Sequence, residues 1–424
     1  MRTPGQLITV GVQYRLNMLG FLATADLAAE PGWVGNQGIA DAIAALQWVQ
    51  GNILAFGGDA SRVVIAGQSS GGTLIFALFC APSAAGLFAG ALALSGSPNI
   101  TQSAAAKQAQ DAPTVAALGC DTPPTPAARV ACLRALNASV LAQATGKASP
   151  SWGTPGIFGW SLPAGIPAPP TGQGYAGIVH VDGMLLTSPF HAALANQLVP
   201  SALIISNMEA EGDGGGDGIG ALNASYAQWQ ALLSASFPAA AWGGEGAAAA
   251  AAIGAAYDAE AMVSPDLAYQ SISTDYGLSC ASRDLAALCA ATGVPRSAPL
   301  YIMLNAWQRS SWDSSGAGRW PYHGLDWQML GWGWPSSFTP APSDFAGASL
   351  LQQLLSDFAA SKGVLPAAWG WSPVLPGHPL QTLVLAQEGG WPGGGVRALQ
   401  RVKERQCAVL AAHLRPAQNY WWCD

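Results

Sequence analysis

Charged residues are scarce in this chain. Only 10% of its 424 residues are Asp, Glu, Lys or Arg, which argues against a disordered chain or a coiled coil. The 17 basic residues are outnumbered by 24 acidic ones and form no basic run, which argues against nucleic acid as a partner. No uninterrupted apolar run reaches about 18 residues, so no transmembrane helix is predicted. What is present is ample length and a 50% apolar composition, enough to fold without a metal or a disulfide.

Short apolar runs rich in β-branched residues alternate with helical patterns. The strand-like runs are 7–14, 63–66, 91–95, 203–206, 300–304 and 380–386. The helical patterns are 41–53, 73–80, 350–360 and 396–413. Strands that alternate with helices over this length predict an α/β fold, with a mostly parallel central sheet flanked by helices on both faces.

A Gly-x-Ser-x-Gly motif is the strongest local signal. Gly67, Ser69 and Gly71 lie between the apolar run 63–66 and the helical run 73–80. On a tight strand-to-helix turn the serine takes a strained conformation, which flanking glycines allow. The N–H groups of the following helix then point at the site where an oxyanion develops. The motif predicts a nucleophilic Ser69. The alternative is a Gly/Ser-rich turn without chemistry, or one that holds a phosphate.

A serine nucleophile needs a base and an orienting acid, which follow it in the order acid, histidine in this kind of fold. The histidines are His180, His191, His323, His378 and His413. His323 stands out because it lies in the loop sequence W-P-Y-H-G-L-D-W. The acid should follow a strand, and the run 203–206 is followed by both Glu209 and Glu211. The residues alone leave the choice between these two glutamates open.

These motifs resemble the type-B carboxylesterase/cholinesterase family. The matching blocks are Y-R-L-x-x-x-G-F-L at 14–22, G-N-x-G-x-x-D-x-x-x-A-L-x-W-V at 35–49, F-G-G-D at 56–59, G-L-F at 86–88 and L-S-G-S at 94–97. The resemblance extends over nearly the whole chain and is most specific in the first hundred residues. It implies the α/β-hydrolase fold.

The resemblance also implies a Ser–Glu–His triad. Ser69 matches the nucleophile of the family's G-E-S-A-G, and His323 matches the histidine of its H-G-x-[DE]. The family's D-E-G aligns with Ala210-Glu211-Gly212, which favours Glu211 over Glu209 as the acid.

The resemblance also implies supporting roles for three further residues. Ser70, where the family has Ala, would supply an oxyanion N–H from its backbone. Ser95 matches a serine that supports the triad acid. Gln68 stands where the family has Glu, which removes a negative charge beside the nucleophile.

Two disulfides are implied by the resemblance, one short and one long-range. The pairs are Cys120–Cys132 and Cys280–Cys407, and the cysteines without an implied partner are Cys80, Cys289 and Cys423. Glycosylation sequons begin at Asn99, Asn137 and Asn223. Together these features predict a secreted glycoprotein whose signal peptide would lie in sequence preceding this chain.

The resemblance leads us to expect a chain that is incomplete at its N-terminus. The family's oxyanion hole uses an H-G-G-G-type loop upstream of the strand that ends in Y-R-L, and only residues 1–6 precede that strand here. We expect the strand before this loop to be lacking too, so that the strands at 7–14 and 63–66 lose their shared neighbour. Residues 1–424 should then form one α/β-hydrolase domain without its first strands and oxyanion loop, with little activity.

The predicted activity is hydrolysis of a small-molecule or lipid ester through an acyl-enzyme, with no metal and no organic cofactor. The alternative is a catalytically silent adhesion or partner-binding domain, a kind of member that usually loses triad residues. A Gly/Asp-rich stretch at 212–218 predicts either a Ca²⁺ site or a flexible loop beside the triad acid, and a single copy favours the loop. The tryptophans that follow His323, and Trp371, are expected to pack in the core or in loops.

Overall fold

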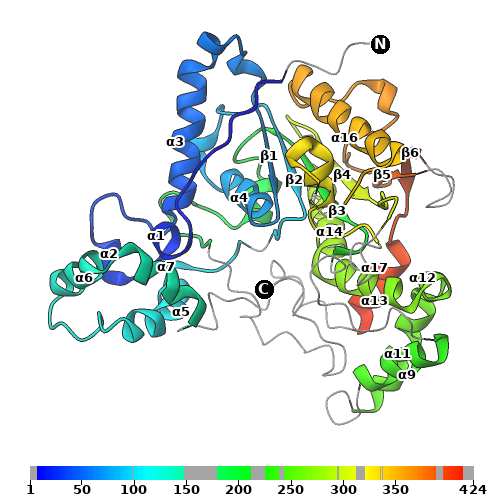
Figure 1. The fold of residues 1–424 in the computed structure, drawn as a ribbon, viewed down its shortest axis with the longest axis horizontal. Helices are drawn as coiled ribbons and strands as arrows, with labels where there is room; N and C mark the ends of the chain where they lie inside the picture. The colour runs from blue at the N-terminus through cyan, green and yellow to red at the C-terminus, as the bar shows by residue number, and fades with distance from the viewer. Residues whose placement is uncertain are drawn as a thin grey trace.

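A computed structural model describes residues 7–98, 100–147, 179–211, 225–237, 243–293, 296–311, 320–334, 336, 338–387 and 395–413. A central sheet of six strands runs through these residues (Figure 1). In spatial and chain order the strands are β1 (Val64–Gln68), β2 (Gly90–Leu94), β3 (Ala202–Met208), β4 (Leu300–Asn305), β5 (Gln381–Ala386) and β6 (Gly395–Gln400). Strands β1 to β5 are parallel, and β6 is antiparallel to β5. The predicted mostly parallel sheet is confirmed.

Alternate residues of each strand enter two different cores. In β3, Leu203 and Ile205 pack into one core, whereas Ala202 and Ile204 pack into the other. This period of two follows from the pleat of a strand. All seven residues of β3 are buried, as expected for a parallel strand covered on both faces.

Helices cover both faces of the sheet. The first core packs against α3 (Gln37–Asn52), α4 (Ser70–Phe79), α8 (Phe190–Ala195) and α14 (Cys280–Ala291). The second packs against α15 (Leu325–Trp327), the π-helix η8 (Gln328–Trp332) and α16 (Pro342–Ala360). Figure 1 shows α3 and α16 on opposite sides of the sheet. Short 3-10 turns connect the elements at η1 (Ile53–Phe56), η2 (Ala60–Arg62), η3 (Pro82–Ala84) and η9 (Ala367–Trp369).

Two smaller helical groups have cores of their own. One comprises α1 (Asn17–Phe21), α2 (Ala25–Ala28), α5 (Ala104–Ala117), α6 (Pro126–Ala135) and α7 (Ala138–Lys147). The other comprises α9 (Tyr226–Ser236), η6 (Gly243–Glu245), α11 (Gly246–Ala256), α12 (Asp258–Val263), α13 (Pro265–Thr274), the π-helix η7 (Asp275–Ser279) and α17 (Glu404–His413). In Figure 1 these groups extend from the two lower ends of the molecule.

The strand predicted at 7–14 does not form. These residues belong to no strand, and most of their side chains are exposed, including Leu7, Ile8 and Val10. Among the described residues, no neighbouring strand is close enough to form backbone hydrogen bonds with them. Without those hydrogen bonds an apolar run is not stabilised as a strand. A cavity of about 1090 Å³ separates residues 7–14 from β1, so β1 is an edge strand with an open side. The expected gap between these two segments is therefore present.

The helix predicted over 396–413 is wrong in its first half. Residues 395–400 form β6, paired with β5, and the helix α17 begins only at Glu404. Arg401 and Lys403 take positive φ values of 62° and 58°, which no α-helix tolerates. The turn between β6 and α17 therefore breaks the pattern that appeared helical in sequence.

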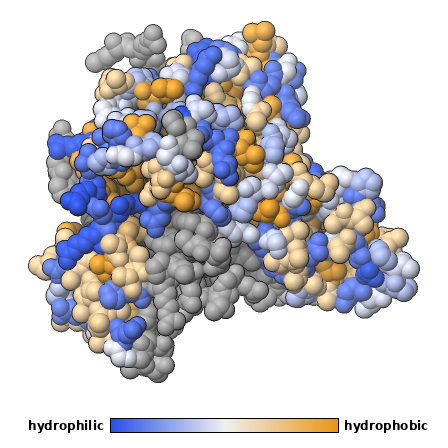
Figure 2. Space-filling model, turned by 180° about the vertical axis from the view of Figure 1, so that it is seen from behind, coloured by the Kyte–Doolittle hydropathy of each residue, from blue (hydrophilic) through white to orange (hydrophobic). Residues whose placement is uncertain are grey.

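One stretch among the described residues, 37–56, is long and apolar enough by composition to cross a membrane. Its buried positions, such as Ile39, Ile43 and Leu46, pack in the first core, and core helices meet the same criterion. Figure 2 shows pale, weakly apolar side chains mixed with scattered polar ones over the rear face, in keeping with the low charge content.

Candidate functional site

The Gly-x-Ser-x-Gly motif forms a sharp turn between β1 and α4. Ser69 stands between the two elements with φ 59° and ψ −121°, a conformation that L-residues rarely adopt and that indicates strain. A Cβ atom on Gly67 would lie 2.5 Å from the carbonyl oxygen of Gly71, so a glycine is needed where the chain turns back on itself. The turn has the predicted geometry, and the catalytic role of Ser69 stays a prediction.

Two more glycines bring the first turn of α4 against the end of β2. A Cβ on Gly72 would lie 2.8 Å from the carbonyl oxygen of Leu94, and a Cβ on Gly96 would lie 2.4 Å from the carbonyl carbon of Gly72. The N–H of Ser69 also donates to Leu94, at 2.9 Å. The first N–H groups of α4, that of Ser70 among them, have no partner inside the helix. This helix end favours a negative charge beside Ser69.

Glu211 and His323 are joined directly. Oε2 of Glu211 lies 2.6 Å from Nδ1 of His323, and a carboxylate can only accept, so Nδ1 carries the proton. The N–H of Met208 donates to the other carboxylate oxygen at 2.8 Å. The backbone of Glu211 is held as well, since its N–H donates to Oγ1 of Thr274 at 2.9 Å. Its carbonyl accepts from the N–H of His323 at 3.1 Å.

Glu209 lies two residues earlier and has a different environment. Its N–H donates to the carbonyl of Asn305, and its carboxylate helps raise the pKa of the buried Lys403. The glutamate bonded to His323 is therefore Glu211, the one that the resemblance favoured. Sequence reasoning gave no sign of Thr274 or Lys403, because Thr274 lies 63 positions from Glu211 and no motif includes either residue.

Asp326 adds a second carboxyl group near His323. It is fully buried, with Oδ1 accepting from the N–H of Trp327 at 2.8 Å. Oδ2 has no hydrogen-bond partner among the described residues. Burial, followed by the charge of Glu211, raises the pKa of Asp326 to about 7, and His323 offsets this in part. For His323 burial acts against the charge, but Glu211 and Asp326 outweigh it and raise the pKa of the imidazole.

The loop of His323 lies beside the serine turn. Gly324 has φ +89°, and a Cβ there would lie 3.7 Å from Nε2 of Gln68. Gln68 is the last residue of β1 and Glu211 follows β3, and the carboxyl ends of parallel strands meet along one edge of a sheet. Ser95 is buried at the end of β2 and its N–H donates to Ser206 at 2.7 Å. Its hydroxyl has no partner within the described residues, so its supporting role stays a prediction.

Both implied disulfides are present. Cys120 bonds to Cys132 across 12 residues, and Cys280 bonds to Cys407 across 127 residues. Cys80 and Cys289 are free and buried. Cys423 lies outside the described residues, as do Asn99, Asn223 and the Gly/Asp-rich stretch 212–218. Of the three sequons, Asn137 is described, and it lies on the surface at the start of α7.

Trp371, predicted to pack, is confirmed in that role. It is 6% exposed, and its ring lies 4.8 Å from that of Tyr301 in the second core.

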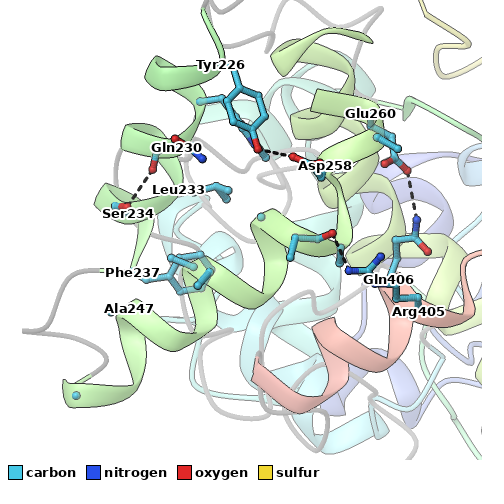
Figure 3. Close-up of a pocket in the computed structure, with 18 residues that line it drawn as sticks. Tyr226, Gln230, Leu233, Ser234, Phe237, Ala247, Asp258, Glu260, Arg405 and Gln406 are labelled. Carbon is cyan, nitrogen blue, oxygen red and sulfur yellow. Dashed lines mark hydrogen bonds between the residues drawn. The ribbon is translucent and has the colours of Figure 1, made fainter. Parts of the chain in front are cut away.

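A cavity of about 1420 Å³ lies between α9, α11, α12 and α17, and Figure 3 shows Tyr226 and Asp258 pointing toward each other at its edge. Its lining includes none of Ser69, Glu211 and His323. The smaller cavity beside β1 does reach the serine turn, at Gln68 and Ser70.

A cluster of three or more His, Cys, Asp or Glu side chains suited to a metal ion is not found among the described residues.

A comparison of the sequence with known protein families places the chain in one of them. The profile of the carboxylesterase family matches residues 1–359. The chain belongs to the carboxylesterase family. Membership brings the α/β-hydrolase fold, which the mostly parallel sheet and its flanking helices display.

Curated relatives match over shorter stretches. Carboxylesterase 3 of Pongo abelii is 44% identical over 133 residues, 31% of this chain and 22% of that protein. Human cocaine esterase is 48% identical over 90 residues, 21% of this chain and 15% of that protein. The medium-chain fatty acyl-CoA hydrolase precursor of Anas platyrhynchos is 36% identical over 157 residues, 37% of this chain and 27% of that protein. The chain thus aligns with less than a third of the length of each.

Proposed function

We propose that this chain hydrolyses carboxylic esters, at the low rate expected without the family's oxyanion loop, with Ser69 as nucleophile, His323 as base and Glu211 as the orienting acid. The observation that carries the proposal is the partly buried Glu211–His323 hydrogen bond of 2.6 Å, in a loop adjoining the strained turn of Ser69. A carboxylate fixed on Nδ1 leaves Nε2 as the basic nitrogen of the imidazole. That is the arrangement a serine nucleophile requires.

The reaction proceeds through an acyl-enzyme. Oγ of Ser69 attacks the acyl carbonyl while His323 takes the hydroxyl proton, and Glu211 stabilises the imidazolium that forms. The N–H of Ser70 and the N-terminal end of α4 stabilise the oxyanion. His323 returns the proton to the leaving alcohol. It then takes a proton from the water that attacks the acyl-enzyme, and it gives that proton to Oγ of Ser69 as the bond to the acyl group breaks and the carboxylic acid leaves.

The substrate class that we propose is a small-molecule or lipid ester. The names of the relatives support it, because they describe esterases and an acyl hydrolase. We also propose that the chain belongs to the secretory pathway, with glycosylation of Asn137. The two disulfides support this compartment, since oxidising surroundings are where such bonds persist.

Replacement of Ser69 tests the proposal. We expect Ser69→Ala to abolish hydrolysis of a short-chain nitrophenyl ester while the melting temperature stays near that of the wild type. Ser349→Ala, on the exposed side of α16, is the matched control and should keep full turnover. Measurable turnover that is equal in Ser69→Ala and the wild type would contradict the role of Ser69, and a wild type that neither turns over the ester nor reacts with a fluorophosphonate would favour a silent binding domain.

A further inference from the structure

Lys403 is a buried lysine between β6 and α17. It is 4% exposed, and its backbone has φ 58°, as Arg401 two residues earlier has φ 62°. Positive φ values at residues other than glycine are unfavourable and persist only where the surroundings require them. Here the turn carries the lysine side chain into the helical core that contains the Cys280–Cys407 disulfide.

Several carboxylates surround the ammonium group of Lys403. Nζ lies 3.1 Å from Oδ2 of Asp275 and 3.7 Å from Oε1 of Glu260. The ring of Tyr257 is 5.9 Å away, and its hydroxyl donates to the same oxygen of Asp275 at 2.9 Å. The charge of Glu209 also helps raise the pKa of Lys403, which adds a third carboxylate to this cluster. One buried cation therefore serves three acidic groups on separate elements.

The charges of this cluster are consistent with that arrangement. Burial acts against the charge of Lys403, but Asp275, Glu209 and Glu260 together raise the pKa of its ammonium above the ordinary value. Burial raises the pKa of Asp275, although Lys403 and Tyr257 lower it in part. A single cation shared among three carboxylates stays charged itself, yet compensates each carboxylate incompletely.

Two of these carboxylates belong to the segments that hold Glu211. Asp275 directly follows Thr274, whose hydroxyl accepts from the N–H of Glu211. Glu209 lies two residues before Glu211 in the same loop. Asp275 also marks the point where α13 widens into the π-helix η7, a feature often found at functional sites. Movement of either segment would displace the carboxylate that lies 2.6 Å from His323.

We propose that Lys403 is a positioning residue for the hydrolysis, because its ammonium pairs with Asp275 and attracts Glu209 and thereby fixes the two segments that hold Glu211 against His323. This inference rests on the proposed function. The alternative is that Lys403 only stabilises the packing of α17. An ammonium that touches no reacting atom should act on kcat and leave KM unchanged.

Three variants test this role by steady-state kinetics with an ester substrate. We expect Lys403→Met to lower kcat about ten- to hundred-fold, the scale of a small misplacement of a catalytic group, with KM within about twofold. Lys403→Arg keeps the charge and should recover most of the activity. Lys403→Met combined with Asp275→Asn removes the uncompensated charge and should exceed the single methionine variant in both kcat and melting temperature.

Lys107→Met is the matched control. Lys107 is fully buried and pairs with Asp111 at 2.5 Å, within the separate core around α5. We expect it to lower the melting temperature and leave kcat unchanged. If Lys403→Met keeps full kcat, or if Asp275→Asn gives it no recovery in kcat or melting temperature, the inference fails. A wild type that neither hydrolyses esters nor depends on Ser69 would instead overturn the proposed function.

Discussion

Glu209 and Glu211 differ in their surroundings more than their sequence positions suggest. Both follow β3 and both are buried, but Glu211 is bonded to His323 whereas Glu209 belongs to the cluster around Lys403. The sequence limited the choice to these two residues, and the family motif favoured Glu211. The contacts that hold it, from Thr274 and Met208, depend on the folded chain and have no local pattern.

Substitution of the two glutamates should separate their roles. Glu211→Gln keeps the shape but loses the charge that fixes the imidazole tautomer, so kcat should fall about 10⁴-fold. Glu209→Gln should cost far less, because the carboxylate bonded to Nδ1 of His323 is that of Glu211. Steady-state kinetics at neutral pH measure both. A larger loss from Glu209→Gln than from Glu211→Gln would show that the acid has been misassigned.

Asp326 should make stability depend on pH. Its folded-state pKa of about 7 lies above the ordinary 3.8, so the structure favours the protonated carboxyl. That stability is fully present below about pH 4 and is lost as the pH rises toward 7. Asp326→Asn imitates the protonated form, and we expect it to melt higher than the wild type at pH 8 and equally at pH 4. If Asp326→Asn melted lower than the wild type at pH 8, the raised pKa of Asp326 would be contradicted.

At the scale of elements, the strands and helices with the strongest patterns were predicted correctly. The runs at 91–95, 203–206 and 300–304 coincide with β2, β3 and β4, because buried parallel strands are uniformly apolar. The strand predicted at 7–14 is wrong because a strand needs a neighbouring strand, which a local sequence pattern cannot reveal. The helix predicted over 396–413 is wrong in its first half because the burial of β6 alternates only partly. The sequence of such an edge strand resembles that of a helix.

The two disulfides should differ in their effect on stability. In the loop-entropy estimate, a bridge across 12 residues contributes about 3 kcal/mol and one across 127 residues about 5 kcal/mol. We expect Cys280→Ala with Cys407→Ala to lower the free energy of unfolding more than Cys120→Ala with Cys132→Ala. Urea unfolding without reductant measures the difference. Equal losses would indicate that strain or denatured-state structure outweighs loop length.

At the scale of the whole molecule, the open side of β1 is the most unusual feature. Its first four residues, 64–67, are apolar, and Ala66 is exposed toward the cavity beside residues 7–14. Natural sheets protect their edges with charges, bulges or covering segments. Apart from this cavity, the layered arrangement of sheet and helices follows the alternation of strand and helix in the sequence.

An edge that the described residues leave uncovered predicts self-association. Ala66→Lys would place a charge on that edge, and we expect it to reduce the concentration-dependent increase in apparent mass seen by light scattering. Ala127→Lys, an equal change on the exposed surface of α6, is the control and should leave association unchanged. An identical effect of both variants would mean that net charge, rather than the edge of β1, governs association.

The adduct with a fluorophosphonate tests the triad most directly. In a crystal structure of the labelled chain we expect the phosphorus on Oγ of Ser69 and a phosphonyl oxygen accepting from the N–H of Ser70. Nε2 of His323 should lie within about 3.2 Å of Oγ, with the Glu211–His323 bond kept. A chain that stays unlabelled, or a label on any other residue, would contradict a nucleophilic Ser69.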